Sequence, residues 1–325
     1  MPMKAMVYRE YGPPHEVLSL EEIPRPDPEE DEVVVRVHSA SVNPLDSHIM
    51  TTIVGRLMCG LRRPRNPIPG VDVSGVVETV GSRVTEFTPG DAVFGSSEGA
   101  FAEYSCAKEA KLAVKPAGLS HEQAAALPVA GLTALQGLRD AGRLKAKQRV
   151  AITGASGGVG TFAIQIAKLY GAYVTAVCST RNLELVRGLG ADHVIDYTQQ
   201  DFTRPDQPYD LIFDLAGNRS LSDLRRALVP KGIYVGVGML GRGISIPAIL
   251  GGLLGTLALK PFISQKLVTF MAKVNTDDLA TLAEMAATGN ITPVIDRRYN
   301  LTETADAIQY VREKKARGKV VINTQ

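Results

Sequence analysis

The sequence of 325 residues contains no tryptophan and only three cysteines, Cys59, Cys106 and Cys178. Because the cysteines are odd in number, far apart and without metal-type spacing, they argue against a disulfide framework and indicate a reducing compartment. The net charge is only +2, which gives no general electrostatic reason to bind nucleic acid. With 45% hydrophobic and 22% charged residues, the composition is that of a globular protein of two domains.

Apolar runs long enough to enter a membrane are also missing. The N-terminal residues MPMKAMVYREYG have no apolar core of signal-peptide length. Residues 244–259 are uncharged and apolar, but they include Pro247, are shorter than a membrane span and end at Lys260. We therefore expect a cytoplasmic protein without a membrane partner, in which 244–259 is buried or interfacial. That segment suits a partner or membrane surface as well as a substrate pocket or a dimer contact.

A glycine-dense turn is the most informative feature that the sequence does have. Residues 149–160 read RVAITGASGGVG, in which a short apolar run ends in the turn and a helical pattern follows. A strand, a tight turn and a helix in this order place a dinucleotide pyrophosphate at a helix N-terminus. Gly157, followed by Gly158 and Val159, lets the chain approach phosphate oxygens, and Gly160 permits close helix–strand packing. Ala155 holds the first glycine position of the usual motif, so the match is partial.

The elements predicted after this turn support a dinucleotide site. Apolar runs predict strands at 173–178, 193–195, 211–213 and 233–237, and a helix is expected near 182–189. Strands that alternate with helices over this length indicate an α/β, doubly wound parallel sheet. The carboxyl ends of such strands form the edge at which ligands bind.

The residues after the second of these strands favour NADPH over NADH. They read Ser179, Thr180 and Arg181, and the first acid is Glu184. A carboxylate there would repel a 2′-phosphate, whereas hydroxyls and a guanidinium can hold one. The alternative is that Ser179 or Thr180 caps the following helix and Arg181 lies in solvent. Neither hydroxyl has a capping-box partner three residues later, which weakens that alternative.

The first third of the chain is organised differently. Short β-patterned runs separated by turn signals occur at 4–8, 32–41, 72–80, 92–94, 101–105 and 111–114, and predict a barrel-like all-β body. A capping box from Ser120 to Gln123 places the domain junction at residue 120. We expect the doubly wound domain over 121–266. The tail carries helical patterns at 277–288 and 302–313 and a strand at 319–322. We expect residues 267–325 to rejoin 1–120 in a discontinuous domain.

Several short motifs follow one another over nearly the whole chain: residues 40–46 (ASVNPLD), 69–75 (PGVDVSG), 90–93 (GDAV), 99–104 (GAFAEY), 151–160 and 317–321 (RGKVV). With these motifs in this order, the chain resembles the medium-chain dehydrogenase/reductase superfamily, in its zinc-less, quinone-oxidoreductase-like branch. The resemblance implies a GroES-like β-barrel domain and a Rossmann domain with the cofactor in the cleft between them, and a homodimer.

The resemblance also identifies what this chain lacks. The places of the catalytic zinc ligands in related alcohol dehydrogenases are held by Asn43, by Val71 with Asp72, and by Ala130, and their amide, isopropyl and methyl groups cannot replace thiolates and imidazole. The four-cysteine lobe of those enzymes is absent too. The implied activity is zinc-independent hydride delivery from NADPH to a quinone or to the β-carbon of an enone or enal.

Two residues are the candidates for chemistry at the reacting centre. By resemblance, Asn43 lies beside the nicotinamide, where its amide can bond the ribose, the carboxamide or a substrate carbonyl; otherwise Asn43 and Pro44 only initiate a turn. His48 falls where zinc-dependent relatives keep a proton-relay histidine, and an imidazole suits proton delivery near neutral pH. If His48 is only a polar surface residue, water or a ribose hydroxyl supplies the proton.

Cofactor contacts are implied at positions along most of the chain. Thr133 would otherwise be an ordinary helix residue, Tyr197 a packing residue, and Lys319 a charge beside the last strand. The full set is Asn43, Thr133, Gly157, Gly158, Val159, Ser179, Arg181, Tyr197, Leu215, Gly217, Val237, Gly238, Phe270, Met271 and Lys319.

Other readings of the function stay open. A chain of this kind that binds NADPH with little turnover would be a redox sensor or regulatory protein, and a zinc-independent reductase of unconjugated ketones is a third option. Residues 50–67, with Arg56, Arg62, Arg63 and Arg65, are expected to shape the substrate entrance. Either these arginines are solvated charges, or they favour an acidic or phosphorylated acceptor.

Overall fold

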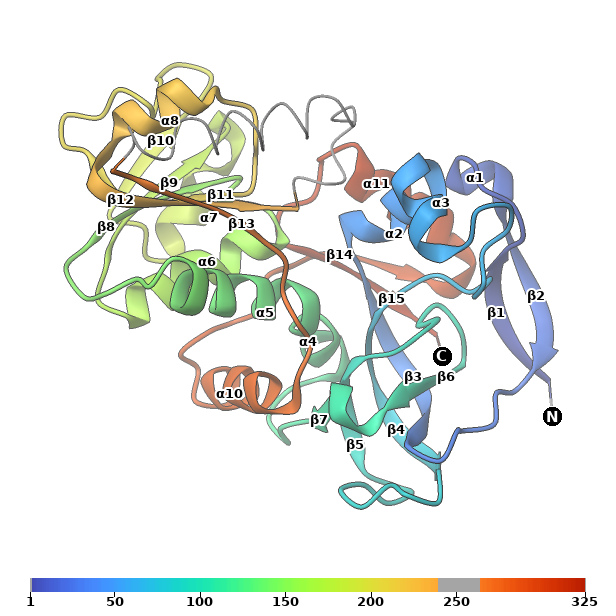
Figure 1. The fold of residues 1–325 in the computed structure, drawn as a ribbon. Helices are drawn as coiled ribbons and strands as arrows, with labels where there is room; N and C mark the ends of the chain where they lie inside the picture. Colours follow the sequence, from blue (N-terminus) through green and yellow to red (C-terminus); the bar gives the residue numbers. More distant parts are fainter. Residues whose placement is uncertain (1, 239–263, 325) are drawn as a thin grey trace. The chain divides into compact units, whose positions relative to one another are not determined.

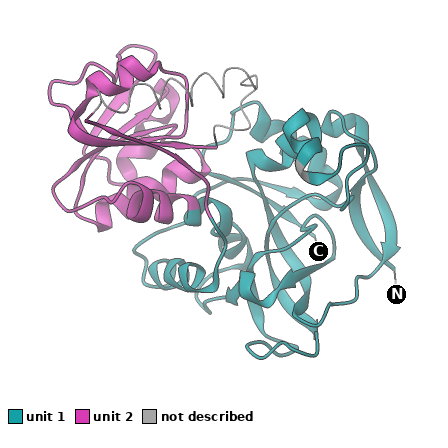
Figure 2. Ribbon diagram, viewed as in Figure 1, with its two compact units in different colours: residues 1–132, 273–325 teal, residues 133–272 magenta. Residues whose placement is uncertain are grey.

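The computed structural model describes residues 2–238 and 264–324, and it consists of two compact units (Figure 2). Unit 1 comprises residues 1–132 and 273–325, and unit 2 comprises residues 133–272. Each unit is described by itself below. The apolar stretch 244–259 lies outside the described residues.

Unit 1 is built on a seven-stranded, mainly antiparallel sheet (Figure 1). The strand order is β14-β15-β3-β4-β5-β7, and β6 also pairs with β3. A separate antiparallel pair is formed by β1 and β2. The strands are β1 (Pro2–Tyr8), β2 (Leu18–Pro24), β3 (Glu32–Val42), β4 (Asp72–Val80), β5 (Ala92–Ser96), β6 (Tyr104–Lys108), β7 (Leu112–Val114), β14 (Ile295–Asn300) and β15 (Lys319–Asn323).

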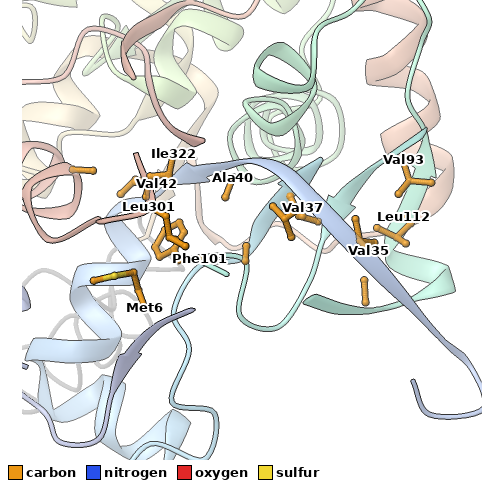
Figure 3. Close-up of a cluster of buried hydrophobic side chains, with 14 of the residues drawn as sticks. Met6, Val35, Val37, Ala40, Val42, Val93, Phe101, Leu112, Leu301 and Ile322 are labelled. Carbon is orange, nitrogen blue, oxygen red and sulfur yellow. The ribbon is translucent and has the colours of Figure 1, made fainter. Parts of the chain in front are cut away.

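The core of unit 1 lies against β3, which changes its buried face partway along (Figure 3). Val35 and Val37 point into the core, and after an irregularity in the pairing between Val37 and Ser39 the inward residues are Ala40 and Val42. An extra residue in one strand shifts the alternation by one, so a β-bulge at this point explains the change. The bulge keeps both halves of a long strand on one hydrophobic core.

Helices of unit 1 border this sheet. Ser120 and Gln123 form the expected capping box at the start of α4, with the Gln123 N–H donating to the Ser120 hydroxyl at 3.2 Å. Gly289 has φ +73° just beyond α10, a conformation that commonly ends a helix. The helices are α1 (Pro14–Val17), α2 (Pro44–Thr51), α3 (Ile53–Cys59), α4 (His121–Ala125), α5 (Pro128–Gln136), which continues into unit 2, α10 (Thr276–Ala287) and α11 (Thr304–Arg312).

Unit 2 contains the doubly wound α/β sheet that the sequence predicts. The six strands in the described part of this unit are all parallel, in the order β10-β9-β8-β11-β12-β13, and the direction of winding reverses between β8 and β11. The elements are β8 (Arg149–Thr153), α6 (Gly158–Leu169), β9 (Tyr173–Cys178), α7 (Leu183–Gly188), β10 (His193–Asp196), β11 (Tyr209–Asp214), α8 (Leu221–Ala227), β12 (Leu228–Val237) and β13 (Lys266–Phe270).

The structure contains strands that the sequence patterns do not predict. β2, β13 and β14 each lie at a sheet edge or in a two-stranded pair, and much of each is exposed. β6 begins at Tyr104, whereas the pattern places a strand at 101–105, because Phe101 packs into the core of unit 1 from a loop before β6. Edge strands carry little hydrophobic alternation, which is the signal that sequence prediction uses.

Candidate functional site

Unit 2 brings most of the predicted cofactor residues to one edge of its sheet. Because the strands are parallel, their carboxyl ends meet at this edge, and ligands bind there in such folds, next to the reversal between β8 and β11. Each strand end carries part of the set: Gly157, Gly158 and Val159 after β8, Ser179 and Arg181 after β9, Tyr197 after β10, Leu215 and Gly217 after β11, Val237 and Gly238 at the end of β12, and Phe270 and Met271 at the end of β13.

The turn after β8 contains several glycines, and the structure requires glycine at some of these positions but not at others. Gly154 has φ +62°, a conformation that L residues rarely adopt. A Cβ on Gly160 would lie 2.4 Å from the Gly154 carbonyl oxygen, so the turn requires glycine there for its own packing. A Cβ on Gly157, the N-cap of α6, would meet only that oxygen at 3.4 Å, an ordinary contact. The fold therefore does not itself demand glycine at 157.

The residues after β9 are held by a local hydrogen-bond network. The Asn182 amide, buried beneath the turn, donates to the Ser156 hydroxyl at 2.8 Å and to the Ser179 hydroxyl at 3.2 Å. Ser179 makes no capping hydrogen bond from its side chain, and a hydroxyl can both donate and accept a hydrogen bond. Arg181 is exposed on the short turn that follows, and half of the Tyr197 side chain is exposed after the neighbouring strand.

Thr180 differs from its expected role as a phosphate-facing hydroxyl. It donates to the Asp196 carboxylate at 2.5 Å, and the Thr198 hydroxyl donates to the same carboxylate at 2.7 Å. The hydrogen bond from Thr180, with those from Thr198, lowers the pKa of Asp196, which therefore stays ionised at neutral pH. The sequence pattern missed this carboxylate because Asp196 reaches Thr180 only through the pairing of β10 with β9.

A second buried carboxylate shapes the turn after β11. Asp214 accepts the Thr153 hydroxyl at 2.5 Å, the Tyr234 hydroxyl at 2.9 Å and the Gly217 N–H at 2.8 Å. Thr153 in turn accepts the backbone N–H of Leu215 at 3.0 Å. These bonds tie the ends of β8, β11 and β12 together and fix the turn at Leu215 and Gly217 that the sequence assigns to the cofactor.

Unit 1 contains a buried charged cluster around Asn43, which caps α2. The Lys319 ammonium donates to Asn43 Oδ1 at 2.7 Å and to Asp72 Oδ2 at 3.1 Å, and Asn43 Nδ2 donates to Asp72 Oδ2 at 2.8 Å. Asp72 also accepts the Ser41 hydroxyl at 2.8 Å and the Val129 N–H at 3.0 Å. Lys319 is therefore half of a buried ion pair in unit 1, rather than a charge that flanks the last strand in solvent.

A further carboxyl lies beside this cluster. Asp46 completes the capping box of α2 by accepting the Asn43 N–H at 2.7 Å. Burial, together with the negative charge of Asp72, raises the pKa of Asp46 to about 7. The side chain therefore changes its protonation state near neutral pH in a site that solvent does not reach.

The remaining predicted residues have the following places. His48 is half-buried in the last turn of α2, and its backbone carbonyl accepts the Thr52 hydroxyl at 2.8 Å. Thr133 is buried on α5. Asn182, Asp196 and Asp214 are polar residues that sequence reasoning did not assign to a site, and it considered Asp72 only as the replacement of a zinc ligand. One feature of the sequence could have identified these residues. Each is a polar residue at, or close after, the end of a loop or strand in an otherwise apolar run.

Two findings concern metals and membranes. Within residues 2–238 and 264–324, no cluster of three or more His, Cys, Asp or Glu side chains is arranged to hold a metal ion. In the same described part of the chain, no helix has the length and apolar character needed to cross a bilayer.

Comparison with known proteins gives matches over both halves of the chain. Residues 29–117 match the family model described as alcohol dehydrogenase GroES-like domain, and residues 189–322 match the one described as zinc-binding dehydrogenase. The chloroplastic quinone-oxidoreductase homolog of Spinacia oleracea is 32% identical over 98% of each chain. The chloroplastic NADPH-dependent alkenal/one oxidoreductase of Arabidopsis thaliana is 35% identical over 98% of this chain and 79% of its own length.

A solved structure is similar over the full length. The quinone oxidoreductase from Coxiella burnetii matches with a TM-score of 0.87 and 30% sequence identity, covering 100% of both chains. The match extends to the GroES-like and the doubly wound parts alike.

Proposed function

Because this chain belongs to the quinone-oxidoreductase-like branch of the medium-chain dehydrogenase/reductase superfamily, we propose that it reduces quinones or α,β-unsaturated carbonyl compounds with NADPH. When bound, NADPH supplies the hydride. The observation that carries the cofactor choice is the end of β9, where a donor hydroxyl and an exposed guanidinium stand in place of the acid typical of NAD sites.

The residues of unit 2 would hold the cofactor in distinct ways. Backbone N–H groups at the start of α6 and the bare Gly157 suit the pyrophosphate, since a helix N-terminus attracts anions. Ser179 and Arg181 suit the 2′-phosphate through charge-assisted hydrogen bonds. Thr180 is not part of this proposal, because its hydroxyl is bound to Asp196.

We propose that catalysis needs no zinc. The oxygen of Asn43 already accepts the buried Lys319 ammonium, so a metal bound at Asn43 would have to displace or approach a positive charge. At the two other places Val71 and Ala130 offer no donor atom, and the Asp72 carboxylate beside Val71 is already paired with the Lys319 ammonium at 3.1 Å. Elemental analysis of the purified protein should find well under one equivalent of zinc, and chelators should leave its activity and melting temperature unchanged.

The residues of unit 1 would contribute orientation and a proton. The position of the Asn43 amide is fixed by its hydrogen bonds to Lys319 and Asp72. In the proposed role, Asn43 orients the reacting groups and His48 donates the proton to the reduced acceptor. Asn43→Ala should then lower turnover more than it lowers NADPH affinity, and His48→Ala should lower turnover mainly above neutral pH.

An acceptor that supplies its own electron sink fits this set of residues. Stabilising a developing oxyanion is a large catalytic effect, and losing one donor can lower the rate by about 10²–10³. Quinones and enones spread the charge by conjugation, so they need little from the protein. We expect turnover on a panel of quinones and enones, with saturated ketones nearly inert. Fast turnover of a saturated ketone would refute the proposal, and NADPH binding without turnover on any acceptor would favour a redox sensor.

The cofactor assignment has its own experiment. A charge-assisted hydrogen bond contributes about 1.5–3 kcal/mol, so Arg181→Ala should weaken NADPH binding roughly ten- to hundredfold and hardly change NADH binding. Arg187→Ala is the matched control, because Arg187 lies on α7 and pairs with Glu184 at 2.6 Å. Equal affinity of the unaltered protein for NADPH and NADH would contradict the assignment.

We also propose a cytoplasmic homodimer. Strand β13 is at the edge of the described sheet of unit 2, and an edge strand offers unpaired backbone groups to a second copy. The three cysteines are unpaired, as expected in a reducing compartment. Sedimentation should give twice the chain mass, and Val268→Pro in β13 should give the monomer.

A further inference from the structure

Helix α3 carries its large aliphatic side chains on the outside. Ile53 is 73% exposed, Leu57 is 61% exposed, and Leu61, just beyond the helix, is 70% exposed. Ile53 and Leu57 are one turn apart, so they share a face. Gly55 is buried against α2, where a Cβ would lie 2.4 Å from the Ile49 carbonyl oxygen. This is the reverse of an ordinary surface helix, which buries its aliphatic residues.

The fold holds α3 in this orientation. The Thr52 hydroxyl accepts the Gly55 N–H at 3.0 Å and donates to the His48 carbonyl at 2.8 Å, which caps α3 and ties it to α2. At the other end, the Tyr11 hydroxyl donates to the Gly60 carbonyl at 2.5 Å. Both ends of α3, which Figure 1 labels, are thus anchored to unit 1. The exposed aliphatic face is therefore part of the native structure.

The same segment carries a concentrated positive charge. Arg56, Arg62, Arg63 and Arg65 are all exposed, and residues 51–71 contain no Asp or Glu. The net charge of the whole chain is only +2, so this charge of +4 within one segment is a local feature. Exposed aliphatic side chains bordered by arginines make an amphipathic element of the kind that lies in a membrane interface.

We propose that the α3 surface, defined as the exposed side chains between Ile53 and Arg65, docks the protein on an anionic lipid bilayer. The aliphatic side chains would enter the headgroup boundary and the arginines would bind lipid phosphates and carboxylates. An acidic peptide accounts for the arginines but leaves three aliphatic residues in water. A second copy in a symmetric dimer would bring two basic segments together. This inference goes beyond the proposed reductase activity and departs from the sequence expectation of no membrane partner.

The test is cosedimentation of the full chain with vesicles. Binding is expected to vesicles of phosphatidylcholine with about 30 mol % phosphatidylserine, and to be much weaker with phosphatidylcholine alone. Raising the NaCl concentration to about 0.5 M should weaken it, since salt screens exposed charges. The double variant Arg62→Gln/Arg63→Gln should bind about 25-fold more weakly, at about fivefold for each arginine near an anionic surface. Leu57→Gln should lower binding by about tenfold.

Matched variants distinguish binding through the α3 surface from binding through the overall positive charge of the protein. Arg83→Gln/Arg204→Gln removes the same charge from side chains that are 70% and 76% exposed elsewhere, and Leu20→Gln changes an exposed leucine on β2. These controls should bind as the unaltered protein does, with all melting temperatures alike. The proposal is overturned if the protein does not bind the anionic vesicles, or if the controls weaken binding as much as the α3 variants. Binding to poly-glutamate as tight as to vesicles, and insensitive to Leu57→Gln, would assign the surface to an acidic polypeptide instead.

Discussion

Replacing Lys319 by methionine is the sharpest test of the buried cluster in unit 1. The substitution keeps a long unbranched apolar side chain, with a sulfur in place of one methylene, and removes the ammonium group. Asp72, which is fully buried, would lose its countercharge at 3.1 Å, and Asn43 would lose the donor at 2.7 Å. The three other donors to Asp72 are neutral, so they satisfy lone pairs without balancing the charge.

The expected loss of stability is large. Removing one partner of a buried ion pair costs about 3–5 kcal/mol, because an uncompensated charge stays behind. Total stabilities are only about 5–15 kcal/mol, so Lys319→Met should lower the melting temperature by many degrees. Circular dichroism is the suitable probe, since the chain has no tryptophan.

Lys108→Met is the matched control for this prediction. Lys108 pairs with Asp31 at the same N···O distance of 3.1 Å, but the two side chains are 46% and 47% exposed. An exposed pair contributes about 1 kcal/mol or less, so this variant should unfold almost as the unaltered protein does. The double variant Asp72→Asn/Lys319→Met should recover part of the loss. If Lys319→Met is no less stable than Lys108→Met, the reasoning about the buried pair is refuted.

Three further outcomes are expected. Gly160→Ala should lower the melting temperature because its Cβ meets backbone at 2.4 Å, whereas Gly157→Ala should keep the melting temperature and weaken NADPH binding; equal stability of the two would contradict this. Burial, with the nearby charge of His38, lowers the pKa of His121 to about 4, so the unfolded chain binds more protons between about pH 6.5 and 4. Stability should therefore fall as the pH drops through that window, by at most about 3 kcal/mol, and a pH series of thermal melts should show a flatter profile for His121→Gln. Burial raises the pKa of Asp46 to about 7, so the folded state binds more protons than the unfolded state between about pH 4 and 7. Relative to Asp46→Asn, the unaltered protein should lose stability as the pH rises through this range, and a constant difference in unfolding free energy would argue against it.

Local patterns in the sequence are enough to predict many of the strands, turns and helix starts of both units. Strand β4 is found at 72–80 and strand β9 at 173–178, as their apolar runs predict. The glycine turn and the capping box at Ser120 are also found where the sequence places them. Such features depend on residues a few positions apart, so the chemistry of the segment itself carries the information.

Only the tertiary structure decides which distant polar groups meet. Lys319 is 276 positions from Asn43 and 247 from Asp72, and the pairing of β15 with β3 brings the lysine to them. From the sequence alone, Thr180 is a candidate ligand for phosphate. In the structure, the pairing of β10 with β9 places Asp196 against it, and the two side chains form a hydrogen bond. A charged side chain has no periodic pattern that announces its partner, because the free energy of burying it depends on the countercharge that the fold supplies.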